Sequence, residues 1–117
     1  MHDPSAPERF LPLGNIPFHL LLALSGGPAH GYAIGKAVEA RSRGRLDPTT
    51  GALYQALRRL NEDGLVEPTE APSNETDARR KYFRITALGT RVAAAEAARL
   101  AELVDAAREY ALLGRTR

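Results

Sequence analysis

Hydrophobic residues recur at helical spacing in four stretches of the chain, separated by glycine, proline and polar residues. The first predicted helix covers residues 16–24, with Asn15 as its N-cap, and is apolar on several sides. The second covers residues 31–40 and turns four apolar side chains towards a core: Tyr32, Ile34, Ala37 and Val38. Residues 1–14 are polar and contain proline, so we expect a flexible N-terminal arm.

The stretch "DPTTGALYQALRRLNEDGLVE" predicts the third helix, with Asp47 as its N-cap and Gly64 as a left-handed terminator. Pro48 suits the first turn, where a backbone N–H has no partner. Leucines at positions i, i+4 and i+7 form its buried stripe: Leu53, Leu57 and Leu60.

The opposite face of this third helix is polar and basic. At 3.6 residues per turn, Gln55, Arg58 and Glu62 face away from the leucine stripe, with Arg59 beside them. An ordinary amphipathic surface helix carries the same residue types, so this face alone does not define a function.

Two short strands, "LVEPT" and "KYFRIT", follow the third helix and predict a hairpin. Phe83 and Ile85 lie on one face of the second strand, and Tyr82 and Arg84 on the other. Pro68 favours an edge strand. The linking stretch "EAPSNETDARR" is turn-rich and ends in cations, so the hairpin has a basic tip.

Residues 86–113 predict one long helix of about 40 Å, capped by Thr86. Its apolar residues follow near-heptad spacing: Leu100, Leu103, Val104, Ala107, Tyr110 and Ala111. A domain of this size is too small to bury such a stripe, so we expect pairing with a second copy of the chain. The alternative is a helix that folds back onto its own domain.

Positive charge is concentrated in the middle of the chain. The net charge is only +2, but residues 41–60 contain five arginines against one acid, Asp47, and residues 79–84 contain four cations and no acid. Such clusters are typical of a surface that meets phosphates, although each alone is equally compatible with a solvated face.

Several function classes are disfavoured. The chain has no cysteine, which fits a reducing cytoplasm and argues against disulfides and thiolate metal sites. The start of the chain has no secretory pattern, and "IPFHLLLAL" is too short to span a bilayer. His2, His19 and His30 form no metalloprotease motif, and phosphate-binding glycine patterns are missing. We therefore expect neither an enzyme nor a bound cofactor or metal.

Three helices followed by a hairpin are the order of a winged helix–turn–helix, so the predicted fold class is mainly α with a small β-hairpin. We assign residues 1–14 to the arm, 15–86 to the winged domain and 87–117 to a C-terminal dimerisation helix. In this layout the third helix fits the major groove of DNA. Gln55 can then bind adenine, and Arg58 or Arg59 guanine or phosphate. Thr49 and Thr50 lie where a helix start holds a phosphate.

Three motifs resemble the PadR-like transcriptional regulators: "HGY" at residues 30–32, "GALYQALRRL" at 51–60 and "RKYFRITALG" at 80–89. The match covers roughly residues 16–100 in the same order. The resemblance implies a homodimeric repressor of the short form, with a single C-terminal dimerisation helix. It places Thr49, Thr50, Tyr54 and Gln55 at or near DNA, and Arg80 and Lys81 on the wing. Tyr54 can equally be a packing residue.

The predicted function is therefore a sequence-specific DNA-binding regulator that binds a pseudo-palindromic operator as a homodimer. The predicted DNA-binding residues are Thr49, Thr50, Tyr54, Gln55, Arg58, Arg59, Arg79, Arg80 and Lys81, and those of the dimer are Leu100, Leu103, Val104, Ala107 and Tyr110. The resemblance implies release by a small aromatic or hydrophobic effector, for which Phe18, Tyr32 and Tyr110 are candidates, though each also suits a core. The alternatives are a winged module that binds protein, and a zinc- or redox-sensing repressor, which the missing cysteines disfavour.

Overall fold

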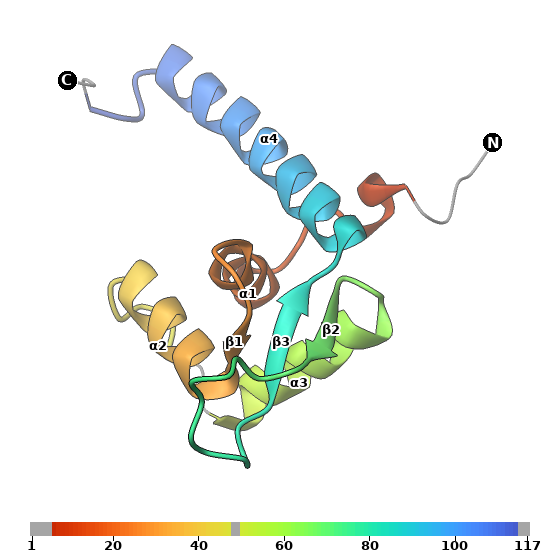
Figure 1. The fold of residues 1–117 in the computed structure, drawn as a ribbon. Helices are drawn as coiled ribbons and strands as arrows, with labels where there is room; N and C mark the ends of the chain where they lie inside the picture. The colour runs from red at the N-terminus through yellow and green to blue at the C-terminus, as the bar shows by residue number, and fades with distance from the viewer. Residues whose placement is uncertain (1–5, 48–49, 115–117) are drawn as a thin grey trace.

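The computed structural model describes residues 6–47 and 50–114 (Figure 1). In this part of the chain the elements are η1 (Pro7–Phe10), α1 (Asn15–Ser25), β1 (Ala29–His30), α2 (Gly31–Arg41), α3 (Thr50–Glu62), β2 (Val66–Thr69), β3 (Tyr82–Ile85) and α4 (Ala87–Glu109). The fold is thus mainly helical with a small sheet, as the order of elements predicts.

The core forms around α1, which packs against α2, α3, α4 and β3. In Figure 1, α4 lies on one side of α1, and α2 and α3 lie on the other. The buried apolar side chains come from every one of these helices and from the start of β2: Leu20, Leu21, Leu24, Ile34, Val38, Leu53, Leu57, Leu60, Leu65, Val66, Val92 and Ala93. Aliphatic residues supply this cluster because the chain has no tryptophan and few aromatics.

The sheet is antiparallel with the order β1-β3-β2, so the predicted hairpin gains a third strand. β1 has only two residues and forms no alternating pattern, which is why the sequence did not predict it. Pro68 lies in β2 at the edge of the sheet, as expected for a residue without a backbone N–H. Glu67 and Arg84 face each other across β2 and β3 and form an ion pair at 2.6 Å.

The end of α3 and the start of α4 meet at one junction. Gly64 ends α3 with φ of +77°, and the Leu65 N–H donates to the Leu60 carbonyl at 2.9 Å, as in a Schellman cap. The Thr86 hydroxyl donates to the Gly64 carbonyl at 2.6 Å and accepts from the Gly89 N–H at 2.9 Å. Thr86 is therefore the N-cap of α4, as predicted, and also ties α4 to α3.

Residues 6–14, which we call the N-terminal segment, are packed on the domain, in contrast to the flexible arm expected for residues 1–14; residues 1–5 lie outside the described residues. η1 packs against α4, and Phe10 and Leu13 lie against the core. The Leu13 N–H donates to the carboxylate of Glu96 at 3.1 Å, and Arg99 binds the same carboxylate at 2.6 and 3.0 Å. The sequence offered no pattern for this contact because it joins residues 83 positions apart.

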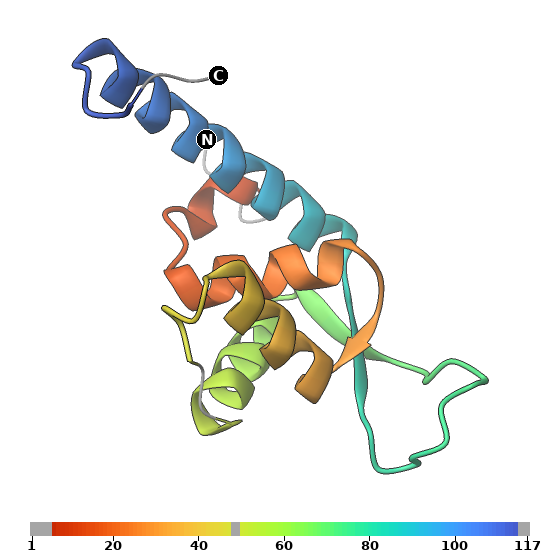
Figure 2. The ribbon, with the colours of Figure 1, turned by 90° about the vertical axis from the view of Figure 1, so that its left-hand side faces the viewer.

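Only the first half of α4 is covered by the domain. Val92, Ala93 and Glu96 are buried, whereas Leu103 and Tyr110 are 56% and 78% exposed. Figures 1 and 2 show the second half projecting past the rest of the molecule. The apolar stripe is therefore not folded back onto its own domain. The helix ends at Glu109, a few residues before the predicted end near residue 113.

Other local predictions had different outcomes. The N-cap of α1 is Gly14, without a side-chain bond, and Asn15 is already helical, so the predicted Asn15 cap is wrong. Tyr32 was expected in the core but is 68% exposed, because it lies on the outer side of the first turn of α2. The predicted cap pair of Asp47 and Pro48 cannot be compared, since Pro48 lies outside the described residues.

Gly89→Ala is expected to destabilise the fold by about 3 kcal/mol, because an added Cβ would lie 2.0 Å from the Leu65 carbonyl oxygen, which belongs to the backbone and cannot move aside. Gly51→Ala is the matched control, since a Cβ there meets nothing within 4 Å; it should leave stability unchanged or raise it by up to about 1 kcal/mol. Urea unfolding measures the free energy of unfolding of both variants. Equal stability of the two variants would contradict the close contact between Gly89 and the Leu65 carbonyl.

Glu96→Gln is expected to reduce the free energy of unfolding at pH 7 by about 1–3 kcal/mol, because the buried carboxylate loses its charge-assisted bonds. The Arg99 hydrogen bond, followed by the Leu13 N–H, lowers the pKa of Glu96 from its ordinary 4.5 despite burial. A lowered folded-state pKa gives stability that is present above 4.5 and is lost as the pH falls through the folded value.

The free energy of unfolding should therefore fall less steeply with decreasing pH in Glu96→Gln than in the wild type. Part of the pH dependence remains in the variant, because the pKa values of Glu75 and Asp77 are also lowered in the folded chain. Glu102→Gln on the exposed side of α4 is the control. Urea unfolding between pH 3 and pH 7 measures both. Wild-type stability in Glu96→Gln at pH 7 would refute this role.

Candidate nucleic-acid interface

The leucine stripe of α3 determines which of its side chains face outward. Leu53, Leu57 and Leu60 are at most 4% exposed and pack into the core. Gln55 and Arg58 are exposed on the other side of the helix, as predicted from the helical period. The outer face of α3 is thus free to contact a partner.

A groove of about 630 Å³ separates α3 from the wing, by which we mean β2, β3 and the loop of residues 70–81. Cations approach it from both sides: Arg58 from α3, and Arg79, Arg80 and Lys81 from the wing. The groove is also lined by polar and aromatic groups from β1, α2 and α3, which are His30, Tyr32, Tyr54 and Asn61. The structure therefore places Arg58 beside three cations that lie about 20 residues further along the sequence.

Tyr54 is both a packing and a surface residue. It is 45% exposed, yet its hydroxyl lies so close to Gly31 that a Cβ at that glycine would be 2.5 Å away. Gly31 is itself buried at the start of α2. The glycine of the His30-Gly31-Tyr32 motif thus makes room for the tyrosine of α3.

The two arginines of α3 are not equivalent. Arg58 lines the groove beside the wing and forms no ion pair with any residue that the structure describes. Arg59 forms an ion pair with Asp63 at 3.4 Å. It lies on the opposite flank of α3, together with Gln55, in a second groove of about 660 Å³ beside the N-terminal segment. Arg58 is therefore the cation of α3 that directly adjoins the wing.

The cations of the wing are partly balanced by acids of the same loop. Arg79 pairs with Asp77 at 3.3 Å, and Arg80 pairs with Glu75 at 3.5 Å. Lys81 has no acidic partner among the described residues. The charge that the wing offers is thus smaller than the run of three cations in the sequence indicates.

Glu75 is the best-connected of these acids. Its side chain is 8% exposed. Its carboxylate accepts from the Tyr82 hydroxyl and from the N–H groups of Thr76 and Asp77 at 2.9 and 3.0 Å. The Tyr82 hydrogen bond is the largest cause that lowers the pKa of Glu75 to about 2. The sequence did not single out Glu75, because a glutamate in a polar loop carries no pattern.

His30 joins α2 to the wing. Its Nδ1 accepts from the Ala33 N–H at 3.2 Å and so caps α2, in line with the predicted place of this histidine at a helix start. Its ring meets the ring of Tyr82 edge-on at 5.3 Å, and its Nε2 lies 3.4 Å from the guanidinium of Arg80.

The predicted site residues are distributed over three places. Tyr54, Arg58, Arg79, Arg80 and Lys81 line the groove beside the wing, whereas Gln55 and Arg59 line the other flank of α3. Thr50 begins α3, and Thr49 lies outside the described residues. The structure adds three groups that the sequence did not assign to this surface: His30, Tyr32 and Asn61. Folding brings His30 and Tyr32 to this surface from other elements, whereas Asn61 follows Tyr54 and Arg58 at helical spacing on α3 and could have been inferred from the sequence.

The candidate effector aromatics do not share one cavity. Tyr32 lies in the groove beside the wing, Phe18 lies half-buried on α1, and Tyr110 follows the exposed end of α4. In the described part of the chain, no group of three or more histidines, cysteines or carboxylates is placed to hold a metal ion. Among the same residues, no helix is both long and apolar enough to cross a bilayer.

One curated relative is an uncharacterised 37.1 kDa protein in a transposon of Streptomyces fradiae. It is 42% identical over 84 residues, which make up 72% of this chain and 22% of that protein. The chain therefore spans about a fifth of the length of this relative.

Solved structures share the fold. A PadR family transcription regulator from Clostridium difficile superposes with a TM-score of 0.70 at 22% identity, covering 83% of this chain and 98% of the other. Bacillus subtilis PadR, solved in complex with operator DNA, has a TM-score of 0.55 at 18% identity, covering 65% of this chain and 42% of the other.

The sequence identifies the family of the chain more specifically than these structural similarities do. Residues 20–95 match the transcriptional regulator PadR-like family, and this range includes all of α2, α3, the wing and the first turns of α4. The predicted resemblance is confirmed, and the chain belongs to the transcriptional regulator PadR-like family.

Proposed function

We propose that this chain regulates transcription by binding duplex DNA, with α3 in the major groove and the wing on the adjacent backbone. The observation that carries the proposal is the placement of Arg58 on the outer face of α3 across a groove from Arg79, Arg80 and Lys81. The major groove is about 12 Å wide and admits one helix. A basic loop beside such a helix can then reach the neighbouring phosphates.

The residues divide into two roles. Gln55 on the exposed face of α3 reads a base, because its amide can bond to adenine through two hydrogen bonds, and Arg58 or Arg59 contacts guanine or phosphate. The start of α3, with Thr49 and Thr50, and the hydroxyl of Tyr54 hold phosphates. The wing cations Arg79, Arg80 and Lys81 hold the backbone without reading sequence. That Bacillus subtilis PadR was solved with operator DNA supports this assignment.

The proposed active form is a homodimer. Leu100, Leu103, Val104, Ala107 and Tyr110 follow one side of α4, and the exposure of Leu103, Val104 and Tyr110 leaves this stripe without a partner in a single chain. A second copy with the same stripe can cover it. Two winged domains related by a twofold axis then bind a pseudo-palindromic operator, with half-sites about 10–10.5 base pairs apart or a multiple of that distance.

We further propose that the chain is a cytoplasmic repressor released by a small aromatic or hydrophobic effector, as its family membership favours. A winged module that binds protein instead of DNA is the second candidate function. Arg58 on α3 and the three cations of the wing disfavour it, because such a module would present a neutral or apolar α3 face.

Fragments selected from the host genome should bind the wild-type chain in gel-shift assays at low salt. Gln55→Ala should relax preference at one base pair, because it removes a base contact.

Lys81→Ala should weaken binding to all sequences alike and lower the slope of log K against log salt by about 1, because it removes one phosphate contact.

Selection of bound sequences at two salt concentrations distinguishes these effects. Glu70→Gln, which changes an exposed side chain of the wing loop, controls for altered loop charge. No duplex binding by the wild type at low salt, over varied sequences, would exclude the proposed function. An unchanged sequence profile in Gln55→Ala would exclude the groove assignment alone.

Leu103→Glu should convert the dimer to a folded monomer, because a carboxylate in the α4 stripe cannot be buried against a second copy. Leu103→Glu tests the α4 interface more specifically than deletion of residues 96–117 would, because Glu96 also binds the N-terminal segment. Ala98→Glu, an exposed change on the opposite side of α4, is the matched control and should stay dimeric. Sedimentation equilibrium measures both, and a dimeric Leu103→Glu would contradict the assigned interface.

A further inference from the structure

The carboxylate of Glu75 lies inside the wing loop and organises it through two separate oxygens. Oε2 accepts from the N–H groups of Thr76 and Asp77 at 2.9 and 3.0 Å, which closes the turn. Oε1 accepts from the Tyr82 hydroxyl and faces the Arg80 guanidinium at 3.5 Å. One oxygen therefore folds the loop, while the other connects it to β3 and to a cation.

Among the described residues, Glu75 is the carboxylate within ion-pair distance of Arg80. Its nearest ring nitrogen is Nε2 of His30 at 3.4 Å, but His30 Nδ1 already accepts from the Ala33 N–H. Nε2 therefore carries the ring proton in the neutral and in the charged histidine, and two donors cannot bond to each other. Among the described residues, Glu75 is the sole ion-pair partner of Arg80.

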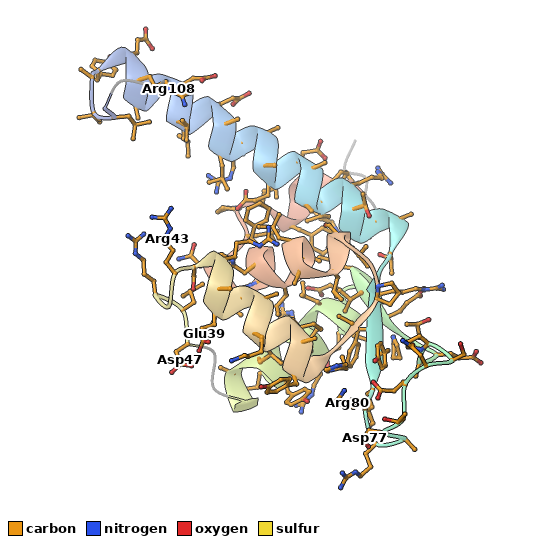
Figure 3. The ribbon with its side chains drawn as sticks, turned by 60° about the vertical axis from the view of Figure 1, so that its left-hand side comes forward. Glu39, Arg43, Asp47, Asp77, Arg80 and Arg108 are labelled. Atoms are coloured by element: carbon orange, nitrogen blue, oxygen red, sulfur yellow. The ribbon has the colours of Figure 1, made fainter. Side chains whose placement is uncertain are left out.

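Because Arg80 faces the groove, its pairing with Glu75 affects how the groove can bind an anion. Figure 3 shows Arg80 on the side of the wing that faces the helices, and Asp77 at the wing tip. Arg80 lines the groove shared with α3, and 45% of its side chain is exposed, against 92% for Arg79 in its pair with Asp77. A phosphate in the groove can reach Arg80 only in competition with Glu75.

We infer that Glu75 is an internal counter-ion that competes with DNA phosphates for Arg80 and thereby limits the affinity that the wing contributes. The inference rests on the proposed duplex binding, and Glu75 acts through Arg80 without touching DNA. Because a guanidinium bound to a carboxylate is already neutralised, its transfer to a phosphate releases fewer counter-ions and adds less to binding. Of the three consecutive cations Arg79, Arg80 and Lys81, Arg80 thus contributes less to binding than its charge alone would.

Glu75→Gln separates this role from folding of the loop. The amide oxygen can keep the bonds from the N–H groups of Thr76 and Asp77, which places the amide NH₂ towards Tyr82 and Arg80. The tyrosine hydroxyl can accept from that NH₂, but the guanidinium has no lone pair to offer. The turn is therefore retained while Arg80 is released. The hydrophobic core lies outside the loop and is unaffected.

Glu75→Gln should bind duplex DNA roughly two- to five-fold more tightly than Glu70→Gln, which removes the same charge from an exposed position in the loop. Its salt slope should be steeper by up to about 1. Arg80→Ala should cost less affinity than Lys81→Ala in the wild-type chain, but as much as Lys81→Ala in the E75Q background. Titration of duplex binding at several salt concentrations measures these affinities and the salt slopes.

The inference would be overturned if Glu75→Gln bound DNA no more tightly than Glu70→Gln. It would also be overturned if Glu75→Gln raised the affinity as much in the R80A background as in the wild type. Carbon NMR titration without DNA tests the bonding of the carboxylate independently: the Tyr82 hydroxyl, the Asp77 N–H and, to a smaller extent, Arg80 should hold the pKa of Glu75 at about 2, against an ordinary value of 4.5. An ordinary pKa would overturn the inference while leaving the proposed function intact. Absence of duplex binding by the wild type would instead remove both.

Discussion

Burial of the α3 leucine stripe is the constraint on which the rest of the surface depends. Leu53, Leu57 and Leu60 can enter the core in only one rotation of the helix, since together they cover a single face. That rotation presents Gln55 and Arg58 to the outside and brings Tyr54 against Gly31 of α2. The binding chemistry of α3 is therefore a consequence of its packing, and a change to the stripe would alter both.

The junction at Gly64, Thr86 and Gly89 transmits this placement to the other half of the molecule. Thr86 bonds to the end of α3 and caps α4, while the backbone of Leu65 lies directly on Gly89. The wing leaves from this junction and returns to it, as Figure 2 shows. Glu96 then attaches the N-terminal segment to α4. The orientation of the proposed dimer helix relative to α3 and the wing is thus held by a few short contacts.

The folded wing presents less positive charge than its sequence suggests. Three consecutive cations look like one basic tip, yet Asp77 and Glu75 occupy two of them in the folded loop. The exposed Arg79–Asp77 pair is worth little in water, whereas the Glu75 carboxylate is largely shielded and bonded on both oxygens. A regulator that must leave its DNA has reason to restrain affinity, and an acid inside the wing is a direct way to do so.

Periodicity determined the four helices and the outward face of α3, because both depend on neighbours within a few residues. The chemistry of single residues indicated the edge position of Pro68, which has no backbone N–H, and the Thr86 cap. Three motifs in order were sufficient for the family. Tertiary structure decided the two-residue strand β1, the exposure of Tyr32, the packed N-terminal segment and the partners of Glu75 and Glu96. These features depend on where distant elements meet, and the energy of such contacts leaves no periodic trace in the chain.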